Sequence, residues 1–436
     1  MSLKLLNFGG KQLLHPAFTP SGTYTVEQEG TYNIANYEFI KVLIEKNELK
    51  QIVCSSYTTW VLKTDGTLWG CGYNAYGQQG KGSSGNVLTF TQRLTDVAKV
   101  ACSGETTWAV KNDGTLWGCG FADYGQQGSG NRTNVAIFTQ RLTDVKSVAC
   151  STSTTWAIKN DGTLWGCGKN DYCQQGSDDY SNVLEFTQRL TDVKSVACST
   201  STTWAIKNDG TLWGCGSNGR YQQGSGDTTT VKTFIQRLTN VKDVLCSTVV
   251  TWAIKTDGTL WGCGYNNTGQ QGSGDIAGIK TFTQRLTDIK SAIISDGSEG
   301  TTWAIKTDGT LWGCGYNAYG QQGSGSSGGY VTTFTQRMTN VKDVVCSNDT
   351  TWALKNDGTI CGCGKGSYGQ QGSGNTNDVT TFTQRLIGVK EAVCSDRTTW
   401  AIKNDGTVLG CGYGSNGQQG SGDTSYVTTF TQRTLE

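Results

Sequence analysis

The stretch TTWAIKNDGTLWGCG at residues 154–168 decides the fold, because close copies of it occur eight times along the chain. Asp161-Gly162 lies between two apolar runs at the spacing of a two-residue hairpin turn. Such a turn needs positive φ at both central residues, and Asp-Gly tolerates this better than most pairs. The stretch therefore predicts a β-hairpin with antiparallel strands on either side of the turn.

A two-residue turn would fix which side chains face one another across this hairpin. Trp156 would lie opposite Cys167 and Ile158 would lie opposite Trp165, with all four side chains on one face of the ribbon. The other face would carry mostly small side chains. One bulky face and one small face favour a sheet whose bulky face packs into the small face of the next copy.

The repeat period predicts a closed all-β fold. Each unit contains four strand candidates, which in the third unit are residues 138–142, 147–151, 154–159 and 163–168. A period in the forties with strand chemistry throughout is typical of a β-propeller and not of a helical array. The hairpin tryptophans are separated by 48, 48, 48, 48, 51, 49 and 48 residues: Trp60, Trp108, Trp156, Trp204, Trp252, Trp303, Trp352 and Trp400.

These units predict a closed eight-bladed β-propeller of four-stranded antiparallel blades over residues 49–436. Residues 1–48 do not share the repeat, and we expect this small N-terminal extension to attach the propeller to a larger assembly; a cap over the propeller end is the alternative. The repeats begin with one strand type, at residues 49–55, and end with another, at residues 427–436. We therefore expect the C-terminal strand to complete the first blade and close the ring.

Composition narrows the classes of function. The formal net charge is +1, whereas a nucleic-acid or acidic-membrane surface would need a basic excess. No apolar run approaches the roughly 18 residues of a membrane helix. The N-terminus lacks the long apolar core of a signal peptide, which predicts cytoplasmic synthesis. We therefore expect no nucleic-acid partner and no membrane insertion.

The recurrence of the cysteines and the position of the only histidine argue against a catalytic site in the repeats. Most of the 17 cysteines recur once per strand in each repeat, which is the pattern of a small buried apolar side chain in reduced form. The only histidine, His15, lies outside the repeats, so Ser-His and Cys-His catalysis and most metal sites are excluded from the repeat region. We predict no cofactor, no metal site and no enzymatic activity.

A family resemblance rests on the residues that follow each hairpin. Residues 72–80 read GYNAYGQQG, and together with the Asp-Gly hairpin this unit resembles the regulator of chromosome condensation repeat. The resemblance covers residues 49–436 and implies a β-propeller. That family is commonly seven-bladed, which makes seven blades the alternative to eight. The chain departs from the family pattern at Gln79, where leucine is usual, at Thr58, where histidine is usual, and at Cys173, which replaces a glycine.

Comparison of the eight units with one another locates a candidate binding face. The loop before each TTW strand and the loop after each GCG strand vary, whereas the other two connections hardly change. Because strands of a meander alternate in direction, both variable loops lie on one side of the disc, opposite the termini. Their tyrosines, asparagines and aspartates resemble an antibody combining site and suit stacking on sugar rings. Loop drift without function is the alternative explanation of this variation.

The candidate ligand-binding residues all belong to these two loops. They are Tyr57, Tyr73, Asn74, Tyr76, Glu105, Phe121, Asp123, Tyr124, Asn170, Asp171, Tyr172, Asn218, Arg220, Tyr265, Asn266, Tyr316, Tyr319, Tyr368, Arg397 and Tyr413.

The leading hypothesis is a non-enzymatic recognition protein that binds a glycan or protein surface, as a receptor-binding component of a phage-like particle. The alternative is an intracellular regulator or inhibitor of a protein partner, since the family includes exchange factors for a small GTPase and a bacterial enzyme inhibitor. An exchange factor would be expected to carry a protruding wedge, and the only insertions are three residues near 296–300 and one near 328–329. Fold alone does not decide between them.

Overall fold

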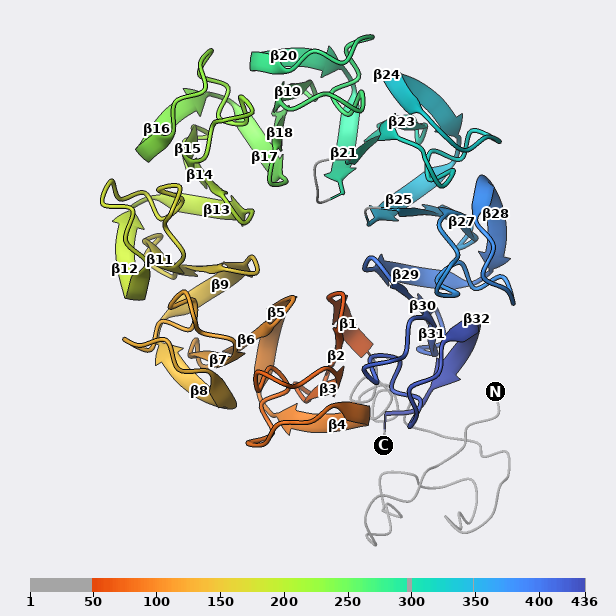
Figure 1. Ribbon diagram of the computed structural model, residues 1–436, viewed down its shortest axis with the longest axis horizontal. Helices are drawn as coiled ribbons and strands as arrows, with labels where there is room; N and C mark the ends of the chain where they lie inside the picture. Colours follow the sequence, from red (N-terminus) through yellow and green to blue (C-terminus); the bar gives the residue numbers. More distant parts are fainter. Residues whose placement is uncertain (1–48, 296–299, 348, 436) are drawn as a thin grey trace, which may run out of the picture.

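The structure is a computed structural model that describes residues 49–435, except 296–299 and 348. Its 32 strands form eight four-stranded antiparallel sheets arranged in a ring (Figure 1). Residues of the innermost strands line a central channel. This confirms the eight-bladed β-propeller over the seven-bladed alternative. The predicted attachment segment, residues 1–48, lies outside the described residues. Within the described part of the chain there is no helix long and apolar enough to cross a membrane.

Each blade consists of four consecutive strands, from the channel outward, and the blades are numbered 1 to 8 along the chain (Figure 1). The innermost strands are β1 (Leu49–Cys54), β5 (Val97–Ser103), β9 (Val145–Cys150), β13 (Val193–Cys198), β17 (Val241–Cys246), β21 (Ile289–Ile294), β25 (Val341–Cys346) and β29 (Val389–Cys394). The second strands are β2 (Thr58–Lys63), β6 (Thr106–Lys111), β10 (Thr154–Lys159), β14 (Thr202–Lys207), β18 (Val250–Lys255), β22 (Thr301–Lys306), β26 (Thr350–Lys355) and β30 (Thr398–Lys403).

The two outer positions of each blade complete the sheet. The third strands are β3 (Leu68–Gly72), β7 (Leu116–Gly120), β11 (Leu164–Gly168), β15 (Leu212–Gly216), β19 (Leu260–Gly264), β23 (Leu311–Tyr316), β27 (Ile360–Gly364) and β31 (Val408–Gly412). The outermost strands, on the rim of the disc, are β4 (Val87–Leu94), β8 (Val135–Leu142), β12 (Val183–Leu190), β16 (Val231–Leu238), β20 (Ile279–Leu286), β24 (Tyr330–Met338), β28 (Val379–Leu386) and β32 (Val427–Arg433).

The hairpin turn differs from the predicted two-residue type. In blade 3 the amide of Gly162 donates to the carbonyl of Lys159, and the amide of Lys159 donates to the carbonyl of Thr163. Gly162 has φ +81°, whereas Asp161 is not among the positive-φ residues. The turn is therefore a three-residue loop, with a type I turn followed by a left-handed glycine. Asp161 instead accepts hydrogen bonds from the amide and hydroxyl of Thr163, at 2.8 and 2.7 Å.

This longer turn shifts the register by one residue, so the predicted cross-strand pairs were wrong. Trp156 lies opposite Gly166 and not Cys167. The second predicted pair shifts in the same way, since Ile158 faces Leu164. A Cβ on Gly166 would lie 2.5 Å from the Trp156 ring, so glycine at this position leaves the space that the indole occupies.

Packing between neighbouring blades follows the predicted principle of a bulky face against a small face. Trp60 and Leu62 of blade 1 pack against Ala109 and Cys119 of blade 2. The eight hairpin tryptophans are essentially fully buried, and each meets a phenylalanine of the next blade's outermost strand edge to face. Their ring centroids lie 5.5–5.8 Å apart in the pairs Trp60–Phe138, Trp108–Phe186, Trp156–Phe234, Trp204–Phe282, Trp252–Phe334, Trp303–Phe382, Trp352–Phe430 and Trp400–Phe90.

Ring closure does not use the C-terminal strand in the predicted way. β32 pairs with β31 in blade 8, and blade 1 is complete with β1 to β4. The prediction was wrong because every blade begins with its innermost strand and ends with its outermost strand, so no strand is left over. The ring instead closes through side-chain packing of Trp400 on Phe90 and a single β-bridge between Ser421 and Thr89.

The connections between strands divide the disc into two faces. On the loop face, the short loop joins the first and second strands of a blade and the long loop joins the third and fourth; Tyr73 of a long loop donates its amide to the Tyr57 carbonyl of a short loop. On the turn face, the amide of Val97 in the connection to blade 2 bonds the carbonyl of Gly66 in a hairpin turn. The variable loops therefore share one face, as predicted.

Candidate binding face

Three positions in each blade display the variable side chains of the loop face. The tip position ends the short loop, and the first and fourth positions belong to the long loop. Going from blade 1 to blade 8, the tip residues are Tyr57, Glu105, Ser153, Ser201, Val249, Gly300, Asp349 and Arg397. The first residues are Tyr73, Phe121, Lys169, Ser217, Tyr265, Tyr316, Lys365 and Tyr413. The fourth residues are Tyr76, Tyr124, Tyr172, Arg220, Thr268, Tyr319, Tyr368 and Asn416.

The backbone under these positions is held in the same way in all eight blades. The amide of the first residue donates to the tip carbonyl, as Tyr73 does to Tyr57 at 3.0 Å. The amide of the fourth residue donates to the side-chain oxygen of the first glutamine of the Gln-Gln pair, as Tyr76 does to Gln78 at 3.0 Å. The second glutamine, Gln79, donates from Nε2 to the carbonyl of Cys71 at 2.8 Å. These buried amides tie the long loop to the sheet, so the variable side chains stand on a constant frame.

Four predicted ligand-binding residues lie inside this frame and were wrongly assigned to the surface. Asn74, Asn170, Asn218 and Asn266 have no exposed surface. Asn74 accepts a hydrogen bond from the amide of Gln79 at 2.8 Å, and the other three asparagines make the corresponding bond. Their amide groups also donate to oxygens further along the long loop. They cannot reach a ligand because the hydrogen-bonding groups that looked available from the sequence are used within the loop.

The surface residues pair across blade junctions by one rule. The fourth residue of each blade meets the first residue of the next blade. Ring centroids lie 4.9 Å apart in Tyr76–Phe121 and 5.3 Å apart in Tyr368–Tyr413. Three further junctions pair a cation with a ring: Lys169 with Tyr124 at 5.1 Å, Arg220 with Tyr265 at 4.9 Å and Lys365 with Tyr319 at 4.4 Å. At the other three junctions Ser217, Thr268 or Asn416 provides neither a ring nor a cation.

One part of the loop face is a continuous row of aromatic rings, which we call the aromatic arc. It crosses the closure between blades 8 and 1, where the guanidinium of Arg397 lies 5.1 Å from the Tyr368 and Tyr413 rings and 6.0 Å from the Tyr57 ring. Neighbouring rings then follow at 4.9–6.0 Å as far as blade 2. The arc consists of Tyr368, Tyr413, Arg397, Tyr57, Tyr73, Tyr76, Phe121 and Tyr124.

Another part of the loop face is hollow, and we call it the groove. Its cavity of about 740 Å³ reaches from Tyr76 and Phe121 at one end to Arg220 and Val249 at the other. It is hollow because the tip residues of blades 3 to 5 are the small side chains Ser153, Ser201 and Val249. Tyr172 stands in this region with 47% of its surface exposed.

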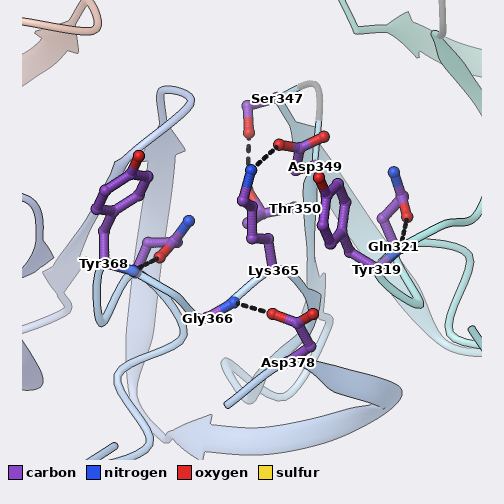
Figure 2. A network of polar contacts seen from close by, with 10 residues as sticks. Tyr319, Gln321, Ser347, Asp349, Thr350, Lys365, Gly366, Tyr368 and Asp378 are labelled. Atoms are coloured by element: carbon purple, nitrogen blue, oxygen red, sulfur yellow. Dashed lines mark hydrogen bonds and ion pairs between the residues drawn. The ribbon is translucent and has the colours of Figure 1, made fainter. Parts of the chain in front are cut away.

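Charged side chains on the loop face are held at defined places. Lys365 pairs with Asp349 at 2.9 Å and lies over the Tyr319 ring, as Figure 2 shows. Burial alone would lower the pKa of Lys365, but the hydrogen bond and charge of Asp349 raise this pKa overall. Burial, helped by the nearby charge of Asp123, raises the pKa of the Glu105 carboxyl.

The remaining predicted residues are at least partly exposed on the loop face. Sequence comparison missed Lys169, Lys365 and Asp349, which occupy the same positions as predicted tyrosines but differ from them in chemistry. The signal that could have found them is positional equivalence, because Lys169 and Lys365 stand where Tyr73 stands in blade 1. Spacing alone could not show that these lysines lie over the tyrosine rings of the preceding blade.

The cysteines are buried or half-buried. All 17 are free thiols. Burial raises the pKa of Cys54 and Cys150 to about 12, which keeps these thiols neutral near pH 7. Among the described residues no three histidine, cysteine, aspartate or glutamate side chains are grouped so as to hold a metal ion.

Two of the repeats match a known family model. The family model described as the regulator of chromosome condensation (RCC1) repeat matches residues 49–78 and 193–222. The chain carries RCC1 repeats. Each matched segment runs from an innermost strand to the first glutamine of the Gln-Gln pair in the long loop, and so ends before the second glutamine of the frame described above. No curated protein matches the chain.

Several solved structures share the fold at low sequence identity. The structure of human WBSCR16 is 19% identical, with a TM-score of 0.59, and the match covers 73% of this chain and 94% of that one. Prp20p from Saccharomyces cerevisiae is 18% identical, with a TM-score of 0.58 and coverage of 81% and 92%. Yeast RCC1 (Prp20) bound to Kap60 is 15% identical, with a TM-score of 0.57 and coverage of 97% and 91%.

Proposed function

We propose that the chain is a non-enzymatic recognition protein that binds the surface of another macromolecule through its loop face. The observation that carries this proposal is the contrast within each junction: the buried Trp–Phe pair is constant, whereas the exposed pair above it differs from junction to junction. Loops on a rigid scaffold are where binding residues usually lie, and exposed tyrosine and arginine are the side chains most enriched at the centres of interfaces.

A protein surface is the partner that the comparisons favour. Prp20p is described as binding Gsp1p and histones, and yeast RCC1 is described as bound to Kap60. Those partners belong to those proteins, and the loop-face residues of this chain are its own. The RCC1-repeat propeller is nevertheless a fold that presents protein-binding surfaces, which supports the same class of function here. A receptor-binding role on a phage-like particle is the more specific form of this proposal, with a cell-surface protein or glycan as the ligand.

A binding screen with the fluorescently labelled full chain tests the proposal. Its arms are a protein array, a glycan array and whole cells from several sources. We expect saturable binding in the protein or cell arm, at physiological salt. Binding in the glycan arm alone would make the ligand a carbohydrate, and saturable binding to cells would support the receptor-binding form. The absence of saturable binding in all three arms would contradict the proposal.

A further inference from the structure

The groove contains a buried hydroxyl that has no hydrogen-bond partner. The hydroxyl of Ser201 donates to the carbonyl of Thr248 in the next blade, at 3.3 Å. Ser153 occupies the same tip position one blade earlier, is only 5% exposed, and its Oγ has no hydrogen-bond partner. A buried hydroxyl without a partner destabilises the fold, so a polar group that enters the groove and hydrogen-bonds Ser153 would recover part of that loss.

The groove also carries a cation at one end and an acid at the other. The guanidinium of Arg220 lies over the Tyr265 ring, 4.9 Å from its centroid. Arg220 is exposed, and no ion pair to it is found among the described residues. Lys169, in the middle, is already paired with Asp171 at 3.2 Å. Glu105 lies at the opposite end, in blade 2. This arrangement attracts a carboxylate to the Arg220 end and repels it from the other.

An exposed aromatic side chain completes the groove. Tyr172 is the fourth residue of blade 3, and its partner position in blade 4 is Ser217, which is too small to cover the ring. Tyr172 therefore keeps 47% of its surface exposed. The other tyrosines at the first and fourth positions are half-buried. A ring left uncovered beside a partnerless hydroxyl and a free guanidinium offers both apolar and polar contacts within one cavity.

Backbone strain marks the same two blades. Six long loops place glycine after the fourth position, with φ between 74° and 82°. Blades 3 and 4 place Cys173 and Tyr221 there instead, with φ 60° and 63°. Positive φ is costly for side chains other than glycine, and such strain tends to gather at functional sites. The single β-bridges from a long loop to the next outermost strand occur at seven junctions, and the described residues show none between blades 3 and 4.

We propose that the groove is the main contact site of the loop face and binds an extended, acidic peptide segment of the protein partner. A carboxylate of this segment pairs with Arg220, a neighbouring apolar side chain lies on the Tyr172 ring, and a backbone amide or carbonyl bonds the hydroxyl of Ser153. This inference rests on the proposed function, because it names the chemistry that the loop face recognises.

Selection from a phage-displayed library of random linear peptides on the immobilised full chain tests the inference. We expect enrichment of sequences in which Asp or Glu stands next to an aromatic or aliphatic residue. In the Arg220→Glu variant the affinity for these peptides should fall about tenfold or more. Selection on that variant should instead enrich lysine or arginine. Arg397→Glu makes the same charge reversal in the aromatic arc and so compares the two parts of the loop face. Lys194→Glu, at an exposed position on the turn face, is the control for charge reversal alone.

The possible outcomes separate this inference from the proposed function. A clearly larger loss of binding in Arg220→Glu than in Arg397→Glu, with unchanged binding in Lys194→Glu, supports the groove. A smaller loss in Ser153→Ala supports the role of the hydroxyl. The reverse pattern, with loss only in Arg397→Glu, would overturn the groove assignment and leave the loop face as the binding surface. Failure to enrich acidic peptides would also overturn the inference, whatever the protein, glycan and cell screen shows. Unchanged melting temperatures in all of these variants exclude unfolding as the cause of a loss of binding.

Discussion

Each blade junction has a pair in the buried core and a second pair on the loop face, and the two pairs differ in how much they vary. The buried pair is Trp and Phe at all eight junctions, with ring centroids 5.5–5.8 Å apart. The loop-face pair is Tyr76 and Phe121 at one junction, Arg220 and Tyr265 at another, and Tyr172 and Ser217 at a third. Both pairs lie between the same two blades, and the buried pair is the same at every junction, including the one that closes the ring. The loop-face pairs are free to serve recognition.

The largest effect that follows from this comparison is on stability, at the buried pairs. Replacing Trp204 by alanine should lower the free energy of unfolding by about 3–5 kcal/mol, through lost burial and an unfilled cavity. Trp400→Ala, at the junction that closes the ring, should cost a similar amount, because its packing on Phe90 has the same geometry as the inner junctions. Chemical denaturation of both variants measures this. A much smaller cost at Trp400 would show that closure is looser than the other junctions.

Two equivalent serines should respond differently to the same substitution. Ser201→Ala removes a hydrogen bond to Thr248 and should cost about 1 kcal/mol. Ser153→Ala removes a hydroxyl that has no partner, so stability should be unchanged or slightly increased. Thermal melting of the two variants side by side checks this. Equal losses would mean that Ser153 is bonded within the fold, which would remove one support of the groove.

Relief of backbone strain should have a smaller effect. Cys173→Gly and Tyr221→Gly place glycine where six other blades have it, at positive φ. We expect each substitution to raise the free energy of unfolding by about 0.5–1 kcal/mol. Glycine adopts positive φ without strain, and this gain exceeds the extra backbone entropy that glycine loses on folding. Gly125→Ala in blade 2 is the opposite control and should destabilise, because its Cβ would come 2.7 Å from Leu184. Destabilisation by the two glycine variants would show that these positions carry no strain.

The two faces of the disc should differ in the sign of their pH dependence. On the turn face, hydrogen bonds from the Thr163 side chain and amide hold the pKa of Asp161 below its usual range, and Asp113 and Asp209 are held in the same way. Because the pKa of these aspartates is lower in the folded state, the unfolded chain takes up protons at a higher pH than the folded chain does. The stabilisation by the ionised aspartates is therefore present above about pH 4 and is lost as the pH falls through the folded pKa. On the loop face the pKa of Glu105 is raised, so the folded state holds this proton more tightly than the unfolded chain does. Stability therefore falls as the pH rises through the folded pKa of Glu105.

Melting temperatures across this pH range test the pH dependence. The Asp113→Asn, Asp161→Asn, Asp209→Asn triple variant should lose less stability on acidification than the parent chain. Glu105→Gln should remove the small loss on raising the pH. Parallel pH profiles for parent and variants would contradict the assignment of these shifts.

The repetition in the sequence was enough to predict the eight blades, the bulky-into-small packing and the common face of the variable loops. The register was wrong by one residue because Asp-Gly suits both a two-residue turn and the last two residues of a three-residue turn. Closure was wrong because the strand types at the two ends of the repeats do not show where one blade ends. The buried asparagines were misassigned because a polar side chain in a variable loop looks the same from sequence whether it faces solvent or its own backbone.

The binding role of the loop face is tested by comparing two triple variants of the full chain for binding to a ligand found in the array and cell screen. One replaces Tyr76, Tyr124 and Tyr172, on the loop face, with alanine. The other replaces Thr95, Thr143 and Thr191, exposed residues on the turn face, with alanine. We predict that the loop-face variant loses binding by about a hundredfold or more while its melting temperature changes little, and that the turn-face variant binds like the parent chain. Undiminished binding by the loop-face variant would contradict the account.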